Sequence, residues 1–304
     1  VIVRDTTRYE TNFGNSPISV IEVKQMCGRA GRPGYDPYGE AILVARSGED
    51  ADHLMEDYVE HDTERLTSKL FNEKILRSHV LGLLATEDAD SEESIIDFLK
   101  ETFFGTVSQL YGIESIVEKI VDSLVEEDMA KRNGEKIRVT SFGKRVSDLY
   151  IDPESASILR HAVENMDDDT IDLAILMVAA MTPDVIGLYP KKNDLDEITM
   201  TIEMFDREEY WLIDPWTIRD YDTEFMNSDV KVALLIDDWI REISEDVITD
   251  IRGVGPGDIR AKVDMMDWII YAMSEISYLF NPNAIKKIRP LMTRIRYGDR
   301  KSVV

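Results

Sequence analysis

The sequence contains little cysteine and no long apolar run. Its 304 residues include one cysteine, Cys27, which excludes an internal disulfide and a cysteine-rich zinc site. The four histidines are scattered, and each is expected to be an ordinary surface or packed residue. No apolar stretch approaches the length of a membrane span, and the start, VIVRDTTRYE, lacks the basic and apolar regions of a signal peptide. We therefore expect a cytoplasmic protein with no membrane partner and no metal site of its own.

Basic residues are scarce relative to acidic ones. The chain has 35 Lys+Arg against 60 Asp+Glu and a formal net charge of −25. This balance argues against a protein that coats nucleic acid indiscriminately, because phosphate neutralisation requires clustered cations. The composition still allows nucleic acid to bind inside a channel lined with basic residues. Residues 286–301 carry seven Lys or Arg against one acid, and residues 131–138 form a milder basic run. The surplus acid is either a solvated outer face or an adaptation to a salty cytosol.

A glycine-rich segment with two arginines stands out from this acidic background. Residues 25–36 read QMCGRAGRPGYD, which places Arg29 and Arg32 among three glycines. Glycines let another group approach the main chain, and guanidinium groups suit phosphate. A glycine-rich surface turn is the ordinary alternative, but the whole ordered string from Gln25 to Asp36 is hard to obtain by accident. The segment therefore predicts phosphate binding.

The string closely resembles motif VI of the superfamily 2 helicases, in the Ski-two-like branch that includes archaeal DNA repair helicases related to the helicase part of DNA polymerase theta. In that family the motif lies on the second of two RecA-like domains and faces a nucleotide bound mainly by the first. The resemblance implies that Gly28, Arg29 and Arg32 contact the γ-phosphate of ATP, with one or both arginines as fingers. It implies that Gln25 orders the γ-phosphate or the attacking water. A preorganised guanidinium stabilises charge that builds on phosphoryl oxygens.

Two motifs needed for nucleotide hydrolysis are absent from the sequence. It has no G-x-x-x-x-G-K-[ST] phosphate loop and no Asp-Glu-x-His motif for Mg²⁺. We therefore expect a C-terminal portion that binds no cofactor alone and uses ATP and Mg²⁺ only together with its missing first RecA-like domain. The resemblance implies an ATP-dependent DNA helicase that moves 3′ to 5′ on single-stranded DNA and remodels forks in replication-coupled repair. Replication or repair proteins are expected as further partners.

The segment before the glycine motif predicts a β-hairpin. Residues from Arg4 to Val23 would form two β-stretches about a loop centred on residues 12–17. An ordinary surface hairpin is the plain alternative, whereas in the resembled family a hairpin at this point is the wedge at the duplex junction. The resemblance therefore implies that the strand-separating residues are Arg4, Arg8, Tyr9 and Phe13.

The remaining sequence predicts a mainly α-helical chain with an α/β remnant at its start, in two or three domains. The expected order is the end of the second RecA-like domain at 1–48, a charged connector at 49–71, a winged helix at 72–150 and a helical-bundle ratchet domain at 151–304. Three helical patterns followed by strands about Asn133-Gly134 predict the winged helix. Its acidic third helix favours packing over DNA binding. The bundle resembles the ratchet domain of the same helicases.

The helix expected within residues 253–273 is a second candidate site. It opens with a Gly-Pro turn and carries Trp268, which matches by position the tryptophan that stacks on a base in the resembled family. In the resembled family a basic residue about two turns before the tryptophan holds the strand. Ala261 stands seven residues before Trp268, where some relatives have arginine, and this departure puts that basic residue in doubt. A core tryptophan is the ordinary alternative, because Ile269 and Ile270 follow directly.

Other basic residues could hold the DNA strand. Arg260 and Lys262 lie on stripes next to that of Ala261, and Arg294 and Arg296 belong to the C-terminal basic run.

Two other functions also fit the sequence. One is a Ski-two-like RNA helicase, which shares these domains. In this chain, however, Trp268 lies in a helix that begins with the sequence GPGD, and this favours DNA. A non-catalytic interaction module would also combine a winged helix with a bundle.

Overall fold

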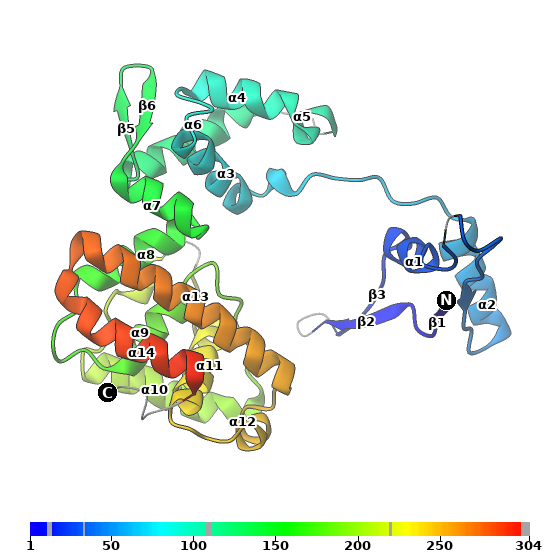
Figure 1. Ribbon diagram of the computed structural model, residues 1–304. Helices are drawn as coiled ribbons and strands as arrows, with labels where there is room; N and C mark the ends of the chain where they lie inside the picture. The colour runs from blue at the N-terminus through cyan, green and yellow to red at the C-terminus, as the bar shows by residue number, and fades with distance from the viewer. Residues whose placement is uncertain (11–13, 33, 108–110, 219–220, 299–304) are drawn as a thin grey trace. The chain divides into compact units, whose positions relative to one another are not determined.

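The computed structural model describes residues 1–10, 14–32, 34–107, 111–218 and 221–298. The chain divides into two compact units, Val1–Thr67 and Ser68–Val304 (Figure 1). Within the described ranges, no helix is long and apolar enough to cross a membrane. Helices dominate, as the sequence predicts.

The first unit combines short strands with helices around a small core. Its elements are β1 (Ile2–Val3), β2 (Thr7–Glu10), β3 (Gly14–Pro17), α1 (Val20–Cys27), β4 (Ile42–Leu43), α2 (Gly48–Leu54) and the π-helical η1 (Met55–Glu60). β1 pairs in parallel with β4, and β2 pairs antiparallel with β3. Val23, Leu54 and Tyr58 form the buried centre.

The predicted hairpin is present, but its second arm is shorter than expected. β2 and β3 pair over residues 7–17, and the turn at Thr11, Asn12 and Phe13 lies outside the described residues. The prediction of strand up to Val23 is wrong, because helix α1 starts at Val20. Ser19 caps α1 by accepting from the amide of Glu22.

A distant carboxylate explains why this β-branched segment is helical. Glu64 accepts hydrogen bonds from the amides of Val20 at 2.6 Å and Ile21 at 3.0 Å. These amides at the start of a helix have no intrahelical partner, and a negative charge there is favoured by the helix dipole. The acceptor lies more than 40 residues away along the chain, so local periodicity could not reveal it.

The second unit begins with the winged helix that the sequence predicts. Its elements are η2 (Lys69–Phe71), α3 (Glu73–Ala85), α4 (Glu92–Glu101), α5 (Phe103–Val107), α6 (Ile113–Glu126), β5 (Ala130–Asn133), β6 (Lys136–Val139) and α7 (Ser141–Leu149). Ser91 caps α4 in a reciprocal capping box with Ser94. Gly134 takes a left-handed φ of 67° in the β5–β6 turn, which fits the glycine preference of such hairpins.

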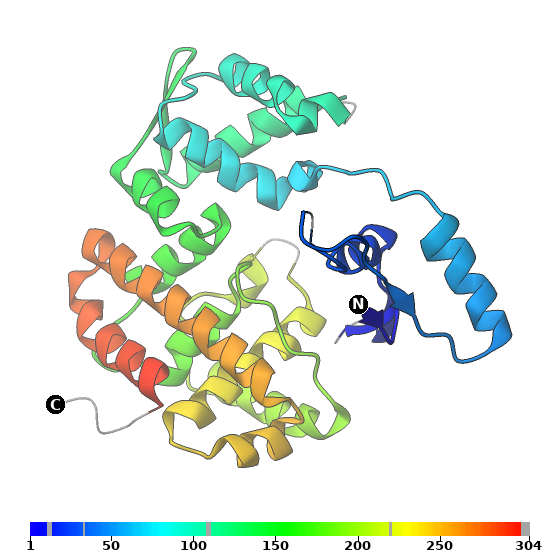
Figure 2. The same ribbon diagram turned by 45° about the vertical axis from the view of Figure 1, so that its right-hand side comes forward.

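A helical bundle completes the second unit. Its elements are α8 (Pro153–Glu164), α9 (Asp172–Ala180), η3 (Lys192–Asp194), α10 (Leu195–Arg207), η4 (Pro215–Thr217), α11 (Thr223–Ile240), α12 (Glu245–Arg252), α13 (Pro256–Phe280), η5 (Pro282–Ala284) and α14 (Ile285–Tyr297). Helix α9 is apolar on all sides and buried from Ala174 to Ala180, which is typical of a central helix. Figures 1 and 2 both show α13 running beside α14 and α8.

Charged and aromatic contacts fasten the winged helix to the bundle. Arg77 of α3 bonds to both carboxylate oxygens of Asp152, at 2.7 and 3.0 Å, and Asp152 also caps α8. Arg160 of α8 lies over the rings of Phe142 and Phe280, 5.7 and 4.5 Å from their centroids. The two rings meet edge to face at 4.9 Å. Helices α3, α7, α8 and α13 are therefore held by one continuous network.

Candidate nucleotide and nucleic-acid sites

The residues of the glycine-rich motif lie at the C-terminal end of α1. Gln25 is in the last turn of the helix, and Gly28 caps it by donating a hydrogen bond from its backbone amide to the carbonyl oxygen of Lys24. Arg29 follows directly. Gln25, Arg29 and Arg32 are all exposed to solvent. The C-terminal end of α1 thus presents the carboxamide of Gln25 and the guanidinium groups of Arg29 and Arg32. Such hydrogen-bond donors suit phosphate oxygens.

The loop after α1 orders Arg32. Asp36 accepts from the backbone amide of Arg32 at 2.8 Å and from its guanidinium Nε at 3.2 Å. The guanidinium also lies 5.5 Å from the ring centroid of Tyr35. A side chain held in this way loses less conformational entropy when it meets a ligand.

A glycine outside the predicted motif closes this loop. A Cβ on Gly39 would come within 2.2 Å of the carbonyl oxygen of Ala30, and within 2.8 Å of the amide nitrogen of Gly31. Gly31 itself takes a φ of +77°. Gly31 of the motif therefore serves the folding of the loop. Sequence analysis missed Gly39, because the residues around it carry no signal that the chain returns to Ala30.

The hairpin arginines make ion pairs inside the first unit. Arg8 pairs with Glu22 of α1, and Arg4 lies 2.9 Å from Asp5. Arg46 also pairs with Asp5, and hydrogen bonds from Arg4 and Arg46 lower the pKa of that carboxyl group. Tyr9 belongs to β2, and Phe13 lies outside the described residues. Whether the hairpin separates strands stays a prediction.

Trp268 lies on the outer face of α13, at the boundary with the winged helix. Its side chain is 37% exposed, and its indole Nε1 donates to the carbonyl oxygen of Leu149 at 3.2 Å. Ala261, Asp264 and Tyr271 are exposed at helical spacing on the same face, while Ile269 is fully buried. The ring is therefore anchored at one edge and open to solvent, unlike a core tryptophan.

The basic candidates near the start of α13 are differently placed. Arg260 donates to Glu245 at 3.1 Å and lies 4.9 Å from the ring centroid of Trp239. Lys262 is buried, with 7% of its surface exposed, and its ammonium group donates to the carbonyl of Ile186. Burial lowers the pKa of Lys262. Only Arg260 of this pair presents its charge at the surface.

The two candidates on α14 also differ. Arg294 is largely buried and pairs with Asp172. Arg296 is about half exposed, and its guanidinium contacts both carboxylate oxygens of Asp267, with the nearest nitrogen at 3.0 Å. Asp267 directly precedes Trp268. Arg296 thereby joins α14 to α13 at the residue that precedes Trp268, on an adjoining face of the helix.

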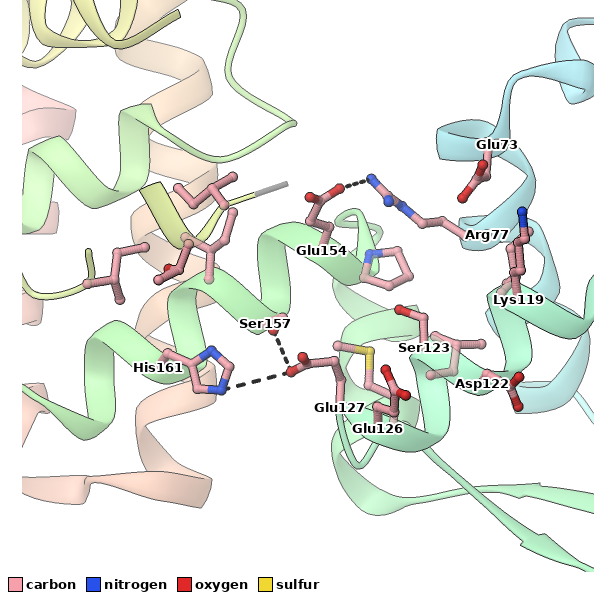
Figure 3. Close-up of a pocket in the computed structure, with 18 of the residues that line it drawn as sticks. Glu73, Arg77, Lys119, Asp122, Ser123, Glu126, Glu127, Glu154, Ser157 and His161 are labelled. Atoms are coloured by element: carbon pink, nitrogen blue, oxygen red, sulfur yellow. Dashed lines mark hydrogen bonds and ion pairs between the residues drawn. The ribbon is translucent and has the colours of Figure 1, made fainter. Parts of the chain in front are cut away.

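A large cavity lies elsewhere, among α3, α6 and α8 (Figure 3). It encloses about 820 Å³, and its charged lining is mostly acidic. Glu127 accepts a hydrogen bond from Ser157 and lies 4.0 Å from His161 Nε2. None of the predicted nucleotide or DNA residues lines this cavity, and its acidity disfavours phosphate. No group of acids, histidines or cysteines in the described ranges could hold a metal ion.

A buried carboxylate in α11 also escaped the sequence analysis. Asp229 is 6% exposed and accepts from the hydroxyl of Tyr221 at 2.8 Å. Burial raises the pKa of Asp229 to about 8, against a smaller opposing effect of that hydrogen bond and of Lys262. Asp229 therefore keeps its proton near neutral pH, a state that the sequence could not predict.

Comparison with known proteins agrees with these features. Residues 173–298 match the family described as archaeal helicase, domain 4, and residues 39–131 match a helix-turn-helix domain. The whole chain is 36% identical to the ATP-dependent DNA helicase Hel308 of Methanocella arvoryzae and 35% identical to that of Pyrococcus horikoshii. The Hel308 of Caldivirga maquilingensis is 31% identical over 98% of the chain. The chain spans 41%, 42% and 41% of these relatives' lengths, respectively.

Proposed function

We propose that the chain belongs to the Hel308-like family of archaeal helicases, to which it is similar along its whole length, and that it is the C-terminal part of an ATP-dependent DNA helicase. The proposed enzyme moves 3′ to 5′ along single-stranded DNA and unwinds or remodels forks. Replication or repair proteins are its proposed partners, and the cytoplasm its proposed location. The observation that carries the proposal is similarity over the whole chain to helicases, together with two arginines exposed at the end of α1.

We assign residues 1–48 to the end of a second RecA-like domain that contributes half of an ATPase site. Gln25, Arg29 and Arg32 would meet the γ-phosphate of an ATP held mainly by the first RecA-like domain. Bound Mg²⁺ would neutralise charge on the phosphates. The guanidinium groups of Arg29 and Arg32 do not ligate Mg²⁺, and we assign its ligands to the first domain. The arginines would stabilise the charge that grows on the γ-phosphoryl oxygens, and would do so only when the two domains close.

We assign the DNA path to the outer face of α13. Trp268 would stack on a base with the exposed side of its indole, because its other edge is held by Leu149. Arg296 would contact a phosphate of the same strand, since it is half exposed and pairs with Asp267, the residue before Trp268 on α13. Arg260 offers a second surface charge. Lys262 is buried, so a direct phosphate contact from it would require the loop at Ile186 to open.

The arginine assignment is tested in the intact helicase by Arg29→Ala and Arg32→Ala. Loss of an arginine finger lowers kcat for ATP by about 10³-fold or more, and nucleotide affinity should change little. Arg46→Ala is the matched control, because Arg46 is another exposed arginine of the first unit, paired with Asp5. Wild-type turnover in both Arg29→Ala and Arg32→Ala would contradict the assignment, as would an equal loss in Arg46→Ala.

A further inference from the structure

Tyr150 occupies the corner between α7 and α8. Helix α7 ends at Leu149, and Tyr150 follows as its C-cap with φ of +57°. Side chains other than glycine and asparagine are disfavoured in this left-handed region. The tyrosine is nevertheless 88% exposed, and within the described residues its side chain makes no hydrogen bond, ion pair or ring contact.

The backbone on both sides of Tyr150 is firmly held. Leu149 and Ile151 are buried, with 8% and 2% of their surfaces exposed. The amide of Asp152 donates to Asp184 at 2.8 Å, and the Asp152 carboxylate binds Arg77. The phenol ring therefore projects into solvent from a fixed corner of the chain.

This corner touches the proposed DNA path directly. The carbonyl oxygen of Leu149, one residue before Tyr150, is the acceptor for the indole N–H of Trp268. Figures 1 and 2 both show α7 against α13. Exposed Lys144 on α7 adds positive charge, and Arg145 reaches to 3.6 Å from Glu275 of α13.

Folding alone does not account for the tyrosine. An exposed ring buries almost no apolar surface, so it contributes little to stability. The left-handed backbone costs free energy that glycine or asparagine would avoid at this position. Among the described residues, four others besides glycine share this backbone, all of them acidic, so the exposed aromatic ring beside a side chain of the proposed DNA path is the feature that is better explained by what it binds.

We propose that Tyr150 is a second base-stacking residue for single-stranded DNA, next to Trp268. This inference rests on the proposed function. Aromatic rings accept any base because every base offers a π-face. Tyrosine on a rigid corner loses little conformational freedom when it binds. The two rings come from different helices and would contact the strand together, while Lys144 and Arg145 lie on the α7 side for its phosphates.

The test compares Tyr150→Asn, Tyr150→Phe and Trp268→Ala in the 304-residue chain. Fluorescence anisotropy with labelled oligothymidylate gives affinity, and thermal unfolding gives Tm. Tyr150→Asn should weaken binding roughly 5- to 150-fold, the range for one base stack, with Tm unchanged or raised. Tyr150→Phe should keep near wild-type affinity. Tyr111→Asn is the matched control, because Tyr111 is 84% exposed in the same unit, and it should bind like wild type.

Three results would overturn the inference in distinguishable ways. Weakened binding for Trp268→Ala with unchanged binding for Tyr150→Asn would remove Tyr150 from the path and leave the proposed function standing. Unchanged binding for both variants would also refute the DNA path on α13. A fall in Tm for Tyr150→Asn with unchanged binding of the folded fraction would assign the ring to fold stability.

Discussion

Replacing Trp268 separates DNA stacking from core packing. About 63% of this side chain is covered, since 37% is exposed. If a whole tryptophan has about 250 Å² of surface, truncation removes roughly 150 Å² of buried surface. At about 25 cal/mol per Å², the free energy of unfolding falls by at most about 4 kcal/mol. The lost bond to Leu149 adds about 1 kcal/mol. Trp268→Ala should therefore lower Tm by about 10 °C or more.

Trp268→Phe provides the matched comparison. Phenylalanine keeps a π-face and much of the covered area, so its main loss is the hydrogen bond to Leu149, about 1 kcal/mol of stability. Its DNA affinity should stay within a few-fold of wild type. Trp268→Ala should lose about 1 to 3 kcal/mol of single-strand affinity, with an unchanged dependence on salt because no phosphate contact is removed.

The assay is titration of oligothymidylate at several salt concentrations, at a temperature well below the Tm of every variant. Unfolding curves from the same samples give the folded fraction and correct the affinities. Unchanged affinity in the folded fraction of Trp268→Ala, together with its large drop in Tm, would refute stacking and return Trp268 to a packing role.

Further predictions use the same chain and the intact helicase. Arg296→Ala should reduce the slope of log K against log salt by about 0.7, whereas Arg294→Ala should mainly lower Tm, because Arg294 pairs with Asp172; the reverse pattern would contradict the DNA path. Burial raises the pKa of Asp229 in the folded state, so stability should fall as pH rises from 4 towards 8, and Asp229→Asn should reduce that slope in urea unfolding; Asp184 and Asp237, whose pKa values burial also raises, would supply the remainder. Shortening the β2–β3 turn should abolish duplex unwinding and spare DNA-stimulated ATPase activity; equal loss of both would indicate misfolding.

Local signals predicted much of the second unit. The cap at Ser91 and the Gly-Pro start of α13 mark helix ends by chemistry that acts within one turn. The turn at Gly134 works in the same way. Such features can be predicted because the capping or turn residue lies within a few residues of the helix end or turn that it determines.

The errors arose where distant residues decide the outcome. Residues 20–23 look like a strand, yet Glu64 completes a helix start there. Lys262 looks like a surface cation, but the chain at Ile186 covers it. Each case depends on tertiary packing, which a periodic pattern does not encode.

The bond between Trp268 and Leu149 has a mechanical consequence. The indole is held by α7 as well as by its own helix, and Arg160 contacts Phe142 of α7 and Phe280 of α13, which ties those two helices together. A ring held on two sides cannot swing to follow a moving strand. Under the proposed function, an advance of the strand past Trp268 would require α7 and α13 to move with the ring, so the length of each step would be set by helix movement and not by side-chain reach.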